Sequence, residues 1–153
     1  MCKKVLISSC LLGKNVKYNG KNNLITKNFF IEKLKSSNLL VPVCPEVDGG
    51  LPIPRVPVEI LKKRAINKSG EDKTREFKKG AKIALENISQ NSIKMAIMKS
   101  KSPSCGRDLI YDGSFTKTLT QGDGITIKFL KQQRIKIFTE EELEDAYEFW
   151  KNL

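Results

Sequence analysis

Short apolar runs alternate with amphipathic stretches along most of this chain of 153 residues. Three of the runs, at residues 5–8, 40–43 and 93–98, have the length and the apolar content of buried strands. A fourth run of this kind lies at 135–138, and a shorter one at 109–111 precedes an Asp-Gly turn. The pattern therefore predicts a sheet of short strands joined by longer connections.

Apolar residues at helical spacing predict four helices between and after these strands, at about residues 26–36, 73–90, 125–132 and 139–151. We expect Thr26 to cap the first helix. Thr139 and Glu142 have the spacing of a capping box for the last helix. Strands that alternate with helices indicate the α/β class. We expect one three-layer, Rossmann-like domain over residues 1–153, with a mainly parallel sheet flanked by helices.

Three of the four cysteines, Cys10, Cys44 and Cys105, each follow one of the first three predicted strands. An open α/β sheet builds its site beyond the carboxyl ends of its strands, so we expect these thiols to converge. A single free cysteine is often only a small buried apolar residue. Three together favour a thiolate site for zinc or an iron–sulfur cluster. Cys2 precedes the first strand, roughly 25 Å from Cys10 at the rise of a strand, and is a poor fourth ligand.

Polar residues close to these cysteines are candidates for acid–base chemistry. Glu46 lies two residues after Cys44, and because of this position we favour a role as general acid or base over that of a solvated loop glutamate. Ser102 and Ser104 precede Cys105, and their hydroxyls could orient a substrate or water, or bind cluster sulfurs. Serine and proline are also common in ordinary turns.

The proline-rich segment at 45–57 is expected to be stiff, either as a wall of the site or as a structural connection. Arg55 within it, together with Lys101 and Arg107, could bind an anionic part of a substrate. Glu59 at its end is expected to begin a helix or to form an ion pair.

Composition restricts the possible functions. Histidine is absent, which excludes Ser-His-Asp and Cys-His catalysis and Cys₂His₂ zinc binding. No apolar run approaches the roughly 20 residues of a membrane span. Ser8, Ser9 and Cys10 interrupt the first apolar run, so it is better explained as a strand than as a signal peptide. We therefore expect a cytoplasmic protein that does not bind membranes.

The formal net charge of +11 is compatible with a nucleic-acid surface or with an anionic small substrate. The basic residues are spread along the whole chain, and the excess of lysine over arginine is also what a biased genome composition would produce. We therefore expect a small-molecule partner and no direct nucleic-acid binding.

Five segments then resemble, in order, one known family. They are SSCLLG (8–13), VPVCPEVDGGLPIPRVPVEI (41–60), EDKTREFKKGA (71–81), KSPSCG (101–106) and IYDGSF (110–115). The family they resemble is the thiouracil desulfurases. The resemblance implies a [4Fe-4S] cluster with three cysteine ligands, here Cys10, Cys44 and Cys105, and one open iron. It also implies that Glu46 and Ser102 assist catalysis.

The reaction implied by the resemblance is a non-redox desulfuration of 2-thiouracil, 4-thiouracil or 4-thiouridine monophosphate that releases hydrosulfide. The open iron would draw electrons from the carbon–sulfur bond, Glu46 would activate water, and Ser102 or Glu46 would donate a proton. We expect Ser104, Arg55, Lys101 and Arg107 to bind substrate.

The family has Tyr-Asp-Gly in the first loop, whereas this chain has Tyr-Asn-Gly, with Asn19 in place of the Asp. This leaves substrate choice open if that side chain touches substrate, whereas a turn role would tolerate Asn. A monomer or weak homo-oligomer is expected. Two alternatives to the enzyme are a non-catalytic iron–sulfur or zinc protein that binds RNA, and a sulfur carrier or redox sensor.

Overall fold

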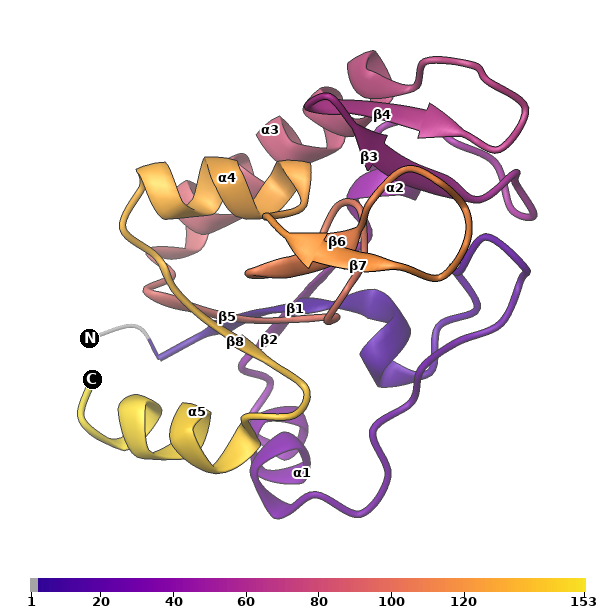
Figure 1. Cartoon of the computed structure of the whole chain (residues 1–153). Helices are drawn as coiled ribbons and strands as arrows, with labels where there is room; N and C mark the ends of the chain where they lie inside the picture. Colours follow the sequence, from indigo (N-terminus) through magenta and orange to yellow (C-terminus); the bar gives the residue numbers. More distant parts are fainter. Residues whose placement is uncertain (1–2) are drawn as a thin grey trace.

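Four parallel strands form the centre of the molecule, in the order β2-β1-β5-β8 (Figure 1). They are β1 (Val5–Ser8), β2 (Leu40–Val43), β5 (Met95–Met98) and β8 (Lys136–Thr139). The structure, a computed structural model, describes residues 3–153. All residues of β1 and β5 are buried, because these central strands are covered on both faces.

Two layers of helices cover this sheet (Figure 1). The helices α1 (Phe29–Ser36) and α5 (Leu143–Lys151) pack on one face, where Val5 and Ile7 meet Phe30 and Trp150. On the other face lie α3 (Thr74–Asn91) and α4 (Ile125–Gln132). The predicted α/β class and the three layers are confirmed. Among the described residues, no helix has both the length and the apolar character needed to cross a membrane.

Two antiparallel hairpins form separate two-stranded sheets beyond the carboxyl end of the central sheet. They are β3 (Val58–Leu61) with β4 (Arg64–Asn67), and β6 (Leu109–Tyr111) with β7 (Leu119–Gln121). Only the strand at 109–111 is expected from the sequence, because the others are short: β3 follows directly on the proline-rich segment, and polar residues make up half of β4 and most of β7. A separate apolar cluster that includes Ile60, Phe77 and Ile110 packs the hairpins against α3.

Helix starts differ from the sequence-based expectations at two places. Thr26 is not the cap of α1: the Asn28 side chain accepts the Ile31 N–H, so the helix begins at Phe29. Thr139 does not cap the last helix: the Glu142 carboxylate accepts the Thr139 N–H at 2.9 Å as expected, but the Thr139 hydroxyl accepts the N–H of Glu141 and not that of Glu142. The pair lies just before α5, which begins at residue 143.

Two short helical turns, one after β1 and one after β2, position the site. The one-turn helices η1 (Ser9–Leu12) and α2 (Pro45–Asp48) follow β1 and β2 directly. Two glycines let α2 contact the backbone of α3. A Cβ at Gly80 would overlap the Pro45 carbonyl, and one at Gly49 would overlap the Glu76 carbonyl. This close approach fixes α2, which carries Glu46.

We predict that Gly80→Ala destabilises the protein by about 1–3 kcal/mol through overpacking, although alanine is the better helix former by about 1 kcal/mol. Urea unfolding measures the difference. Lys79→Ala, on the exposed side of the same helix, is the matched control and should be neutral or slightly stabilising. A Gly80→Ala protein as stable as the Lys79→Ala protein would contradict the close contact.

Candidate active site

One cavity of about 640 Å³ opens beyond the carboxyl ends of β1, β2 and β5, and all three expected cysteines line it. Cys10 lies in η1, Cys44 directly follows β2, and Cys105 lies in the loop after β5. The three thiols are free of disulfides. Cys2 lies outside the described residues. The structure therefore brings Cys10, Cys44 and Cys105 to one site.

Burial disfavours the thiolate form of each of these cysteines. It raises the pKa of Cys105 to about 12 and that of Cys44 to about 11. Burial also raises the pKa of Cys10, although the Asn23 amide opposes it by donating to the sulfur at 3.4 Å. Cys105 in turn accepts a hydrogen bond from Ser104 at 3.6 Å. Thiolates in this cavity therefore need a compensating positive charge, which a bound metal centre supplies.

The arrangement of the thiols bears on the kind of metal centre. Among residues 3–153, no three Cys, Asp or Glu side chains converge closely enough to hold a single metal ion. A cluster binds each thiolate through a different metal atom, so it tolerates a wider ligand spacing. Three soft donors around one cavity, in a chain without histidine, fit an iron–sulfur cluster better than mononuclear zinc.

A chain of hydrogen bonds runs along one wall of the cavity. The Glu46 Oε2 atom accepts a hydrogen bond from the Ser104 hydroxyl at 2.9 Å, and the Ser104 and Ser102 hydroxyl oxygens lie 3.0 Å apart. Ser102 Oγ also accepts the Cys105 N–H at 3.0 Å. Ser104 therefore connects Glu46 to Ser102, and the chain can move a proton between the carboxylate and the loop that carries Cys105.

Arg55 holds the other side of Glu46. Its Nε donates to Glu46 Oε1 at 3.2 Å, while its terminal nitrogens donate to the carbonyls of Pro52 at 3.2 Å and Val16 at 2.9 Å. The Arg55 side chain is only 6% exposed. Since every guanidinium nitrogen already has a protein acceptor, the geometry favours a positioning role for Arg55 over substrate binding.

Aromatic and basic side chains also line the cavity. Its lining includes three aromatic and five lysine side chains: Tyr18, Tyr111, Phe115, Lys17, Lys68, Lys99, Lys101 and Lys117. Apart from Lys99, these lysines have no ion-pair or hydrogen-bond partner for their ammonium groups within the described part of the chain. Flat apolar surfaces beside free cations suit a ring that carries an anionic group.

Two other expectations from the sequence do not match the geometry. Arg107 does not line the cavity: its guanidinium donates to Glu142 at 2.9 Å and to the Ile137 carbonyl at 2.6 Å. Glu59 neither begins a helix nor, within the described residues, forms an ion pair. It lies in β3 and accepts the N–H groups of Gly113 at 3.0 Å and Phe115 at 3.1 Å.

Glu59 thereby fixes the loop that brings Phe115 to the cavity, a role that the sequence pattern does not reveal.

Asn19, which stands where the thiouracil desulfurases have Asp, forms part of a turn. It is exposed, does not line the cavity, and accepts the Lys21 N–H at 3.0 Å.

Known proteins share this architecture. A family model described as 2-thiouracil desulfurase matches residues 5–142. The chain is 35% identical over 151 residues to the uncharacterized protein YbbK of Bacillus subtilis (strain 168), a match that covers 92% of this chain and 98% of YbbK. A solved structure of the [4Fe-4S]-dependent thiouracil desulfidase TudS is similar at a TM-score of 0.95 and 36% identity, with 98% of this chain and 99% of that chain covered.

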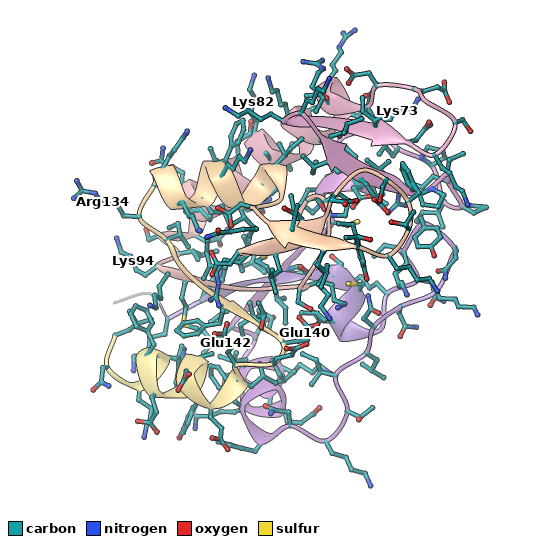
Figure 2. All side chains as sticks on the ribbon, in the orientation of Figure 1. Lys73, Lys82, Lys94, Arg134, Glu140 and Glu142 are labelled. Atoms are coloured by element: carbon teal, nitrogen blue, oxygen red, sulfur yellow. The ribbon has the colours of Figure 1, made fainter. Side chains whose placement is uncertain are left out.

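We predict that Arg55→Lys lowers the free energy of unfolding by about 1–3 kcal/mol, because one ammonium cannot serve all three acceptors of the guanidinium. Denaturant unfolding measures the loss. Arg134→Lys is the matched control, since Arg134 is exposed (Figure 2). Equal stability of the two variants would show that Arg55 does not hold the loops together.

Proposed function

Because the chain belongs to the 2-thiouracil desulfurase family, we propose that it is an iron–sulfur enzyme that replaces the sulfur of a thiolated pyrimidine with oxygen. The observation that carries the proposal is the shared cavity, in which three free thiols, that of Cys105 buried, lie beside a hydrogen-bonded carboxylate. We assign the activity to the whole chain as one domain, because the sheet and both hairpins all contribute to the cavity lining.

We assign Cys10, Cys44 and Cys105 as the ligands of a [4Fe-4S] cluster, which leaves one iron without a protein ligand. When bound, this cluster supplies a Lewis acid with affinity for the soft thiocarbonyl sulfur. The raised pKa of each free thiol is consistent with this assignment, since the cations of the cluster would offset the cost of burying thiolates.

The chain's own residues carry the acid–base steps. Glu46 accepts a proton from the attacking water, and Arg55 holds the carboxylate in place. Ser104 and Ser102 relay a proton along the cavity wall toward the reacting group. A carbon–oxygen bond forms and the carbon–sulfur bond breaks, so thiopyrimidine and water yield the oxo-pyrimidine, hydrosulfide and a proton. No electrons are gained or lost overall.

The basic rim favours a substrate with a phosphate over a free base. Lys68 and Lys117 line the cavity, and among the described residues neither ammonium has a hydrogen-bond or ion-pair partner. We therefore prefer 4-thiouridine monophosphate to 2-thiouracil or 4-thiouracil as substrate. Lys17 and Lys101 contribute to the same positive field.

Anaerobic reconstitution tests the proposed function. The purified protein should bind about four irons per chain and release hydrosulfide from a thiopyrimidine. Cys105→Ala should lose both the full iron content and the activity, whereas Cys2→Ala, the matched control, should keep both. A colourless zinc protein, or a Cys105→Ala protein with undiminished activity, would refute the proposal. Iron binding without hydrosulfide release would favour a carrier or sensor.

Lysine variants test the phosphate preference. We expect Lys68→Ala and Lys117→Ala each to raise KM for 4-thiouridine monophosphate by about tenfold, the equivalent of about 1.4 kcal/mol, and to leave KM for 4-thiouracil nearly unchanged. Lys82→Ala, on the outer side of α3 (Figure 2), is the control for loss of a distant positive charge. Equal effects on base and nucleotide would contradict phosphate recognition.

A further inference from the structure

A second charged group lines the cavity near Cys10 and takes no part in the chain from Glu46 to Ser102. Lys99 and Ser100 follow β5 and belong to the cavity lining. The Lys99 ammonium donates to Glu140 Oε2 at 2.8 Å and to the Ser100 hydroxyl at 3.1 Å. Both charged side chains are mostly shielded, with 27% of Lys99 and 18% of Glu140 exposed.

Glu140, labelled in Figure 2, is held in place by hydrogen bonds. It directly follows β8, and its two carboxylate oxygens accept the Ser100 N–H at 2.7 Å and the Ser100 hydroxyl at 2.9 Å. Burial raises the pKa of Glu140, but the hydrogen bonds from Lys99 and Ser100 outweigh it, so that this pKa lies below its ordinary value. Glu140 is therefore an anion near neutral pH.

The pair is oriented with respect to Cys10. Lys99 lies beside the strand that leads to Cys10, because its backbone N–H donates to the hydroxyl of Ser8, two residues before Cys10, at 2.9 Å. Lys99 also lines the cavity, whereas Glu140 does not. A fixed positive charge thus faces the cavity, and its counter-charge lies behind it.

We propose that Lys99 and Glu140 form an oriented charge pair that sets the electrostatic potential at the Cys10 side of the site. This inference rests on the proposed function, because it assigns the pair a metal centre to act on. The ammonium stabilises negative charge at this side of the cavity, both on the Cys10 thiolate and on hydrosulfide before it leaves. Glu140 fixes the position of the ammonium, and its negative charge reduces the positive potential that the ammonium produces at the site. Lys99 and Glu140 are positioning residues that act through charge.

Reduction potentials of the reconstituted protein test this inference without relying on catalysis. A nearby cation favours the added electron, so Lys99→Met should shift the potential of the cluster to a more negative value. Glu140→Gln keeps one of the two acceptor oxygens but removes the negative charge, so it should shift the potential to a more positive value. Lys99→Arg preserves the charge and should remain close to the wild type. Iron content is measured for each protein.

Opposite signs for Lys99→Met and Glu140→Gln support the charge pair, because a purely structural defect would not reverse sign. Shifts of the same sign, or unchanged potentials with full iron content, would overturn it. If Lys99→Met fails to hold iron, the reduction potential of the Glu140→Gln protein is the test. A negative shift or no shift of that potential refutes the inference. A wild-type protein that binds no cluster would instead refute the proposed function on which the pair's role depends.

Discussion

The site depends on the point where the winding of the parallel sheet reverses. The chain passes from β1 to β2 on one side of β1 and then crosses to β5 on the other side, so that connections diverge from the ends of β1 and β5. A crevice opens at such a point because no connection covers it. Cys10 and Cys105 come from the loops after these two strands, and Cys44 follows the neighbouring strand β2. The thiols meet as a consequence of strand order.

Backbone contact and hydrogen bonding then convert this crevice into a shaped cavity. The glycine contacts between α2 and α3 fix the turn that carries Glu46, and Arg55 ties that carboxylate to two neighbouring loops. On the side opposite Arg55, the Ser104 hydroxyl donates a hydrogen bond to the Glu46 carboxylate. The Glu46 carboxylate is thus held by three separate segments, whereas among the described residues Lys17, Lys68, Lys101 and Lys117 line the same cavity without partners for their ammonium groups.

Local patterns in the sequence were sufficient to predict the core, and long-range contacts explain what was missed. The strands β1 and β5 are buried on both faces, so they are visible as continuous apolar runs. By contrast, β7 is exposed and forms only through its pairing with β6, whereas β4 forms through its pairing with β3 and a tertiary contact of Ala65 with α3. The thiols could be placed because each follows a recognisable strand. The role of Glu140 could not, because its partner Ser100 is 40 residues away in the chain.

The central claim is that acid–base residues of this chain act on a substrate held at a three-thiolate cluster. The most direct test compares hydrosulfide release by wild-type and Glu46→Gln proteins that have the same full iron content. Glutamine preserves the size of the side chain but cannot accept the proton from water. The account predicts a loss of about 100-fold or more in kcat, as expected when a general base is removed. An unchanged kcat in the fully loaded Glu46→Gln protein would contradict it.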